Sequence, residues 1–147
     1  MSPRVWIAEP GEAAAVAQLL GEFRTRFFGR TEPSDESLLA SVERLIRDPD
    51  TEYLLAGGDR AAGVAQLRYR HSVWSGTPDC WLEDLYVRDE ERGQGLGAAL
   101  VEAAIDRARA RGCVRLDLDT KDTNREAIAL YERQDFEPAG RLLRRLL

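Results

Sequence analysis

Two periodicities of apolar residues alternate along the chain, one typical of strands and the other typical of helices. Short apolar runs, or apolar residues at every second position, predict strands at residues 5–8, 52–56, 61–69, 80–87 and 114–119. Apolar stripes at helical spacing predict helices at residues 12–23, 34–47 and 124–133, and another that follows the glycines near residue 95 up to residue 111. The final residues, 141–147, have only a poor pattern for a closing strand. This order predicts a mixed α/β sheet with strand–helix–strand crossovers in its second half.

Turn and capping residues mark several boundaries between these elements. Ser34 can cap the second helix, and the turn residues 57–60 join two predicted strands into an antiparallel hairpin. Gly112 stands where a left-handed residue would end the third helix. Thr123 and Glu126 have the spacing of a capping box, which predicts that the last helix starts there.

Length and composition indicate one globular domain over residues 1–147. The chain is 44% hydrophobic and 32% charged, with a formal net charge of −5. Its first residues lack the pattern of a signal peptide, and no apolar run approaches the ~20 residues of a membrane span, so we expect a cytoplasmic protein without membrane contact. The acidic balance disfavours nucleic acid as a partner and favours a cationic ligand if it extends to a cleft.

The few cysteine and histidine residues argue against several kinds of site. Cys80 and Cys113 have neither metal-ligand spacing nor the spacing of a disulfide framework, so we expect no metal. His71 is the only histidine, and no G-x-S-x-G motif accompanies it, which argues against Ser-His-Asp chemistry.

Gly93, Gly95 and Gly97 stand at alternate positions directly before the third predicted helix. A helix start presents backbone N–H groups without intrahelical partners, and glycine lets an anion approach them closely. With Arg92 beside them, the glycines predict a cradle for a diphosphate. One alternative is that they form a flexible turn or a tight packing contact.

A second alternative is a dinucleotide-binding turn, because residues 93–98 also satisfy the G-x-G-x-x-G/A pattern and the next strand ends in Asp117 and Asp119. Five polar residues separate the glycines from the preceding strand, however, and too little chain follows to complete a doubly wound sheet. Both facts weaken this alternative.

The segment around Arg92 resembles a known family signature. Residues 92–97, Arg-Gly-Gln-Gly-Leu-Gly, fit the R/Q-x-x-G-x-G/A motif of the GNAT superfamily of acyl-CoA-dependent N-acyltransferases, after a strand that ends in Leu-Tyr-Val. Residues 124–136 are similar to that family's N-x-x-A-x-x-L-Y-x-x-x-G-F segment, with Asp135 where glycine is usual. Aspartate tolerates a left-handed conformation better than most residues, so we expect the helix cap to survive.

The resemblance implies a mixed, mostly antiparallel central sheet flanked by helices, with a splayed pair of strands that holds coenzyme A. Acetyl-CoA would be the co-substrate, with its diphosphate on the backbone of residues 93–98 and its pantetheine amides on the main chain of residues 85–87. The last helix would face acetyl-CoA with Asn124, Ala127 and Tyr131, which share one side of the helix at positions i, i+3 and i+7. The implied cofactor-binding residues are Leu85, Tyr86, Val87, Arg92, Gly93, Gln94, Gly95, Leu96, Gly97, Ala98, Asn124, Ala127 and Tyr131.

Acetyl transfer to an amine needs a proton acceptor for the amine and a proton donor for the departing thiolate. A lysine-like amine has a pKa of ~10.4, so very little of it is neutral at pH 7. Relatives with the same Leu-Glu-Asp stretch, including diamine acetyltransferases, use its glutamate as the base, which implies this role for Glu83 and the role of general acid for Tyr131. Simple strand alternation puts Glu83 among apolar side chains, so its role requires a bulge. We expect Trp74 and Asp84 to contact the acceptor together with Glu83.

The function implied is transfer of an acetyl group from acetyl-CoA to the primary amine of a small cationic acceptor by direct attack. One alternative is a protein or peptide N-acetyltransferase, which would need an open groove. Another is a non-catalytic acyl-CoA-binding regulatory module, against which the presence of Glu83 and Tyr131 argues weakly. Homodimers are common among similar proteins, and no sequence feature decides the oligomeric state.

Overall fold

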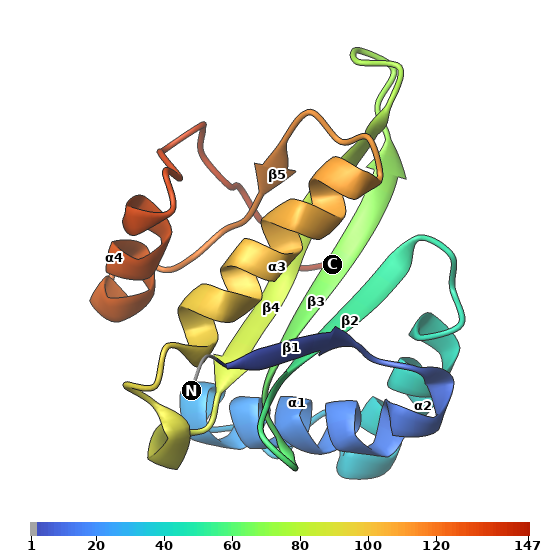
Figure 1. Cartoon of the computed structure of the whole chain (residues 1–147), viewed down its shortest axis with the longest axis vertical. Coiled ribbons are helices and arrows are strands. Elements are labelled where there is room, and N and C mark those ends of the chain that lie inside the picture. Colours follow the sequence, from blue (N-terminus) through green and yellow to red (C-terminus); the bar gives the residue numbers. More distant parts are fainter. Residues whose placement is uncertain (1–2) are drawn as a thin grey trace.

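The computed structural model describes residues 3–147, in which a five-stranded sheet carries helices on both faces (Figure 1). The strands, which lie side by side in chain order, are β1 (Arg4–Ile7), β2 (Thr51–Gly57), β3 (Ala61–His71), β4 (Pro78–Val87) and β5 (Leu116–Asp117). The α-helices of the described residues are α1 (Ala13–Phe28), α2 (Asp35–Leu45), α3 (Leu96–Ala110) and α4 (Arg125–Arg133). Neighbours from β1 to β4 are antiparallel, and β5 is parallel to β4. The predicted mixed, mostly antiparallel sheet is confirmed.

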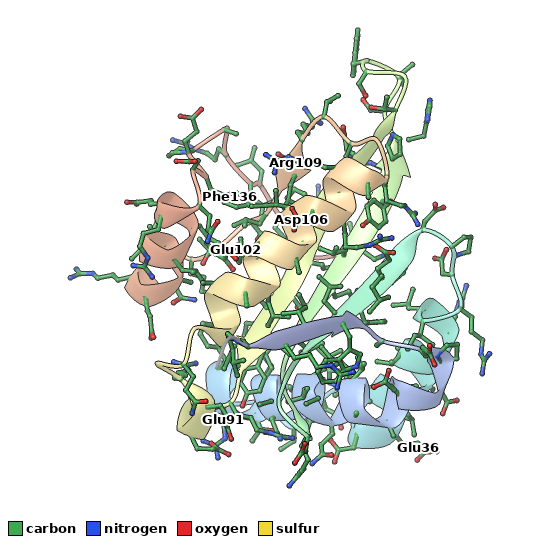
Figure 2. All side chains as sticks on the ribbon, in the orientation of Figure 1. Glu36, Glu91, Glu102, Asp106, Arg109 and Phe136 are labelled. Atoms are coloured by element: carbon green, nitrogen blue, oxygen red, sulfur yellow. The ribbon has the colours of Figure 1, made fainter. Side chains whose placement is uncertain are left out.

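Each face of the sheet carries its own apolar cluster, because successive strand residues point to opposite faces. Leu54 belongs to the cluster beneath α3, whereas Leu55 belongs to the cluster that α1 and α2 cover. The outer side of α3 is charged, with Glu102, Asp106 and Arg109 exposed (Figure 2). None of the helices in residues 3–147 has both the length and the apolar character that a membrane span requires.

The strands β4 and β5 separate soon after they meet. They pair only at Cys80 with Leu116 and at Trp81 with Asp117. From there β4 continues to Val87, while the chain after β5 leads away to α4 (Figure 1). The backbone along this edge of β4 is therefore open, as the expected splayed pair of strands requires.

Two helix boundaries differ from the prediction. Helix α1 continues to Phe28 instead of ending near Phe23, because the rings of Phe23, Phe27 and Phe28 pack with centroids 5.2–5.3 Å apart. Asn124, and not Thr123, caps α4: its side-chain oxygen accepts a hydrogen bond from the Ala127 N–H at 3.3 Å. In both cases the contacts at the boundary join residues within five positions of each other.

Two strand predictions near the C-terminus are wrong. The strand expected at residues 114–119 shrinks to β5, since β4 diverges and leaves the rest without a hydrogen-bonding partner. The closing strand does not form: residues 136–147 have no regular structure, and the leucines among residues 142–147 are exposed. Strands β3 and β4 are longer than predicted, because β3 extends to His71 and β4 starts at Pro78.

Candidate active site

A bulge in β4 determines where its two acidic residues point. Gln66 of β3 pairs with Asp84 and the next residue, Leu67, pairs with Leu82, so Glu83 has no partner of its own in β3. The extra residue turns Glu83 to the α1–α2 side of the sheet, where its Oε2 accepts a hydrogen bond from Gln66 Nε2 at 2.6 Å. The bulge that the predicted role of Glu83 required is therefore present. Sequence patterns did not single out Gln66, because only the strand register brings it to this point.

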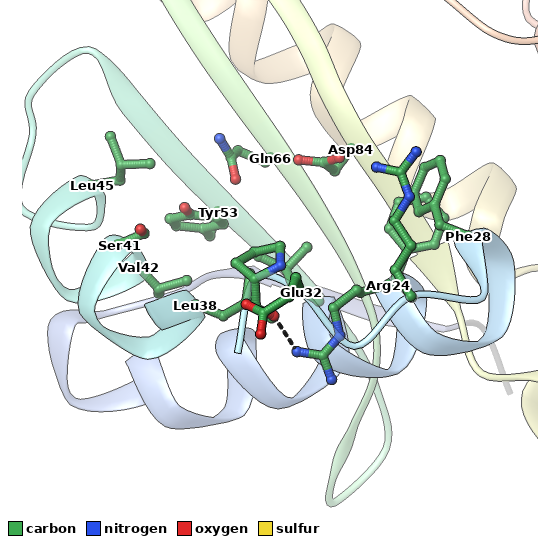
Figure 3. Close-up of a pocket in the computed structure, with 14 residues that line it drawn as sticks. Arg24, Phe28, Glu32, Leu38, Ser41, Val42, Leu45, Tyr53, Gln66 and Asp84 are labelled. Atoms are coloured by element: carbon green, nitrogen blue, oxygen red, sulfur yellow. Dashed lines mark hydrogen bonds between the residues drawn. The ribbon is translucent and has the colours of Figure 1, made fainter. Parts of the chain in front are cut away.

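A partly open cavity of about 330 Å³, the α1–α2 cavity, lies between α1, α2 and the sheet (Figure 3). Gln66, Tyr53 and Asp84 line it from the sheet, and Leu38, Ser41, Val42 and Leu45 line it from α2. Arg24 holds the connection between the two helices, donating from Nη1 to the Pro33 carbonyl oxygen at 2.6 Å and from Nη2 to Asp35 at 2.9 Å. The remaining lining residues are Leu20, Phe23, Phe28, Arg30 and Glu32.

A second, wider hollow of about 570 Å³ adjoins the paired ends of β4 and β5. Charged side chains of both signs line it, together with Trp81 and Tyr69. These charged residues are Arg68, Arg70, Asp79, Glu83, Arg115 and Asp117. Ion pairs already join Arg115 to Asp79 at 2.9 Å and Arg68 to Glu83 at 3.6 Å.

The charge of Asp119 acts on both Asp84 and Tyr131. Burial, followed by the charges of Glu83 and Asp119, raises the pKa of Asp84 to about 6. Burial, followed by the charge of Asp119, raises the pKa of Tyr131 to about 12. The charge of Asp119, which follows β5, therefore acts on a residue of β4 and on a residue of α4. No sequence pattern predicts this, because the position of Asp119 depends on the path of the chain from β5 into α4.

Gly93 and Gly95 have φ angles of 79° and 80°, in the left-handed region that glycine adopts without strain. A Cβ added at Gly93 would meet no atom within 4 Å, so the space beside this turn is open. Helix α3 begins directly afterwards at Leu96, and its first N–H groups have no intrahelical acceptor. Open space, free amides and a positive helix terminus together fit a diphosphate.

Gly97 serves a different purpose from the other two glycines. A Cβ there would lie 3.3 Å from Leu130 Cδ2, so the absence of a side chain lets α3 and α4 approach each other. The packing alternative considered for the glycines thus holds for this position.

Other predicted cofactor-binding residues already have partners. Arg92 pairs with Asp89 and with Glu126, at 3.3 Å in each case, so a bound phosphate would compete with two carboxylates. The Asn124 oxygen caps α4, which leaves its amide N–H groups for a ligand. Leu85, Tyr86 and Val87 lie on the stretch of β4 that β5 does not pair. This backbone edge is available to the amides of a pantetheine chain.

The structure brings most of the predicted site residues together but leaves Trp74 apart. Trp74 is 98% exposed in the β3–β4 loop and lines neither hollow. The predicted contact of Trp74 with the acceptor is not supported by this exposed position.

Asp135 has the expected left-handed conformation, with φ of 65°, so the cap that the family forms with glycine survives.

Comparison with known proteins decides the family. The model of the acetyltransferase (GNAT) family matches residues 14–136. The chain belongs to the GNAT family. Acetyltransferases of this family use acetyl-CoA as their co-substrate, and the glycine turn and the open edge of β4 fit that molecule.

The relatives of this GNAT chain include enzymes with different acceptors. It is 32% identical over 109 residues to thialysine N-epsilon-acetyltransferase of Caenorhabditis elegans, covering 71% of this chain and 68% of that protein. It is 30% identical over 146 residues to aminoglycoside N(6')-acetyltransferase type 1 of Stenotrophomonas maltophilia, covering 97% of this chain and 91% of that protein. The chain spans about half the length of other curated relatives that it matches.

Solved structures show the same fold for this GNAT chain. A crystal structure described as a probable acetyltransferase superposes with a TM-score of 0.87 at 27% identity, covering 98% of this chain and 96% of that one. A transcriptional regulator from Bacillus halodurans C-125 superposes with a TM-score of 0.84 at 25% identity, covering 99% of each chain.

Proposed function

We propose that this chain transfers the acetyl group of acetyl-CoA to the primary amine of a small cationic acceptor. The observation that carries the proposal is the α1–α2 cavity with Asp84 in its wall, beside the point where β4 and β5 separate. A cavity of about 330 Å³ suits a small molecule, and a carboxylate suits an amine that is positively charged in water. Relatives that are named for thialysine and aminoglycoside acetylation support an amine acceptor.

Each part of the site has a proposed role. The amides at the start of α3, with Gly93, Gly95 and Arg92, hold the diphosphate, and the free edge of β4 pairs with the pantetheine chain. When bound, the thioester supplies the acyl group. The carboxylates of the β4 bulge hold the amine and remove its proton, and Tyr131 gives a proton to the departing thiolate. Burial raises the pKa of Tyr131 to about 12, so the phenol holds its proton at neutral pH until the thiolate forms.

The proposed function is tested by mixing the chain with acetyl-CoA and a panel of polyamines, aminoglycosides and lysine-like amino acids, while free thiol is measured. We expect thiol release that depends on the amine. Calorimetry with coenzyme A in the absence of any amine measures binding separately. A chain that binds the coenzyme but releases no thiol with any amine would contradict the proposal.

Coenzyme binding without thiol release is the result expected of a non-catalytic acyl-CoA-binding regulatory module. This module is the second candidate function, and the structural similarity to a transcriptional regulator favours it. A protein or peptide acceptor is a further alternative. Such an acceptor would bind in the wider hollow, which Trp81 and Glu83 line. Adding peptides with free N-termini or lysines to the panel tests it. A cytoplasmic location and a homodimer remain predictions from the sequence.

A further inference from the structure

The neighbouring carboxylates of the β4 bulge open onto different hollows. Asp84 lines the α1–α2 cavity together with Gln66 and Tyr53, and Glu83 does not. Glu83 lines the wider hollow together with Arg68, and Asp84 does not. An acceptor in the α1–α2 cavity therefore meets Asp84 first.

The two hollows also differ in their position relative to the separating strands. Arg115 and Asp117, which line the wider hollow, belong to the segment where β5 still pairs with β4. Glu83 and Asp84 both lie beyond that segment, beside the backbone edge that becomes free. The charge of Asp119 acts on Asp84 and also on Tyr131. Asp84 and the proposed proton donor thus share a charged neighbour.

We propose that Asp84 accepts the proton of the acceptor amine and that Glu83 is a positioning residue at the rim of the site. This inference rests on the proposed N-acetyltransferase function. It reverses the role that the family resemblance implies for Glu83. As the amine nitrogen bonds to the acyl carbon, the carbon–sulfur bond breaks, the amine proton passes to Asp84 and the thiolate takes a proton from Tyr131.

The contacts of Glu83 suit a residue that holds and orients. Its Oε2 accepts the hydrogen bond from Gln66 at 2.6 Å and faces the Arg68 guanidinium at 3.6 Å. Gln66 is only 5% exposed, so this hydrogen bond is anchored in the sheet. The hydrogen bond and the ion pair fix the position of this carboxylate, as the role of a positioning residue requires.

The surroundings of Asp84 suit a proton acceptor. Among residues 3–147 its carboxylate has no hydrogen-bond or ion-pair partner, and burial raises its pKa to about 6, close to the pH at which a general base works best. The titratable and charged groups that face it or line the same cavity are Glu83, Asp119, Tyr53, Arg24, Arg30 and Glu32. Arg24 is itself bound to Asp35, so it does not neutralise Asp84.

The test compares Asp84→Asn, Asp84→Glu and Glu83→Gln in the thiol-release assay between pH 5 and pH 9. We expect Asp84→Asn to lower kcat about 100-fold and to remove the rise of kcat with pH near pH 6. Asp84→Glu should keep that rise at a reduced kcat. Glu83→Gln should raise the KM for the amine and keep the rise. Asp106→Asn, on the outer side of α3, is the matched control and should leave every parameter unchanged.

A second measurement does not depend on turnover. In carbon-13 spectra of the chain without ligands, the carboxyl resonance that disappears in Asp84→Asn should titrate near pH 6. The inference is overturned if Glu83→Gln removes the rise of kcat, or if Asp84→Asn keeps it. It is also overturned if that resonance titrates below pH 4. A wild-type chain that releases no thiol with any amine instead refutes the proposed function, and the inference with it.

Discussion

The carboxylate of Glu52 on β2 accepts two hydrogen bonds from the guanidinium of Arg107 on α3, at 2.6 and 3.2 Å. The Tyr69 hydroxyl donates a third at 2.6 Å, so β2, β3 and α3 meet at one carboxylate. Burial opposes the charge of Glu52, but the hydrogen bonds from Arg107 and Tyr69 outweigh it and hold the pKa of Glu52 below its ordinary value. The pair fixes α3, whose first turn forms the proposed diphosphate site.

Glu52→Gln should therefore destabilise the chain in a pH-dependent way. Because the folded pKa is lowered, the ionised carboxylate contributes stability above pH 4.5, and the contribution is lost as pH falls through the folded pKa. We expect the free energy of unfolding to drop by about 2 kcal/mol at pH 7 and by clearly less near pH 3.5. Urea denaturation at both pH values measures this, with Glu43→Gln on the exposed side of α2 as the control. Equal losses at both pH values would contradict the role of the charge.

How much of this site the sequence predicts depends on the range of the contacts. The glycine turn and the start of α3 involve neighbouring residues, so the motif at residues 92–97 was sufficient to predict them. The need for a bulge at Glu83 was also evident, because strand alternation alone would have put a carboxylate among apolar residues. Its partner Gln66 lies 17 positions away, and only the register of the hairpin brings the two together.

The C-terminal part was predicted least well for a related physical reason. Alternating residues at 114–119 suit a strand, but a strand also needs a neighbour, and β4 turns away after Trp81. The same divergence opens the backbone edge that a pantetheine chain can use. The place where the strand prediction is wrong is thus part of the proposed coenzyme site.

Gly95→Ala should weaken coenzyme binding without a steric clash inside the protein. A Cβ at Gly95 would come no closer than 3.9 Å, to Pro3 Cγ, but φ of 80° is strained for alanine by about 1–2 kcal/mol. We expect the Kd for coenzyme A, measured by calorimetry, to rise about tenfold as the turn relaxes. Gly112→Ala is the matched control: its φ is 81° and its surroundings are open, so it should lower stability alone. A similar Kd for both variants and the parent would argue against a phosphate cradle at this turn.

Tyr131→Phe should slow turnover and leave coenzyme affinity nearly unchanged. The ring keeps its packing against Phe136, 5.7 Å away, so only the hydroxyl is lost. If that hydroxyl protonates the thiolate, kcat should fall about 100-fold. Tyr69→Phe removes another buried hydroxyl, the one bound to Glu52, and should lower stability without slowing turnover. Unaltered turnover in Tyr131→Phe would remove Tyr131 from the mechanism.

Filling the α1–α2 cavity should block the acceptor but not the coenzyme. Ser41 lines the cavity from α2, whereas Ser37 lies one turn earlier on the same helix and does not. We expect Ser41→Trp to raise the KM for the amine at least tenfold, with coenzyme affinity unchanged, and Ser37→Trp to have little effect. Should Ser41→Trp leave the KM for every amine as it was, the acceptor binds elsewhere, and the wider hollow becomes its site.

Asp84→Asn should stabilise the chain at alkaline pH, because the folded structure holds this carboxylate in a place that disfavours its charge. Its pKa is raised from 3.8 to about 6, so the parent chain loses stability as pH rises between these values. Asparagine does not titrate, and because Asp84 is partly exposed we expect a gain of about 1–2 kcal/mol at pH 8 and almost none at pH 4. Thermal unfolding at both pH values measures the difference, with Asp106→Asn as the control. A general base in a partly buried position is expected to lower the stability of the chain when it is ionised, because burial disfavours its charge. A loss of stability at pH 8 would instead mean that Asp84 has a stabilising partner, and such a partner would also compete for the proton of the amine.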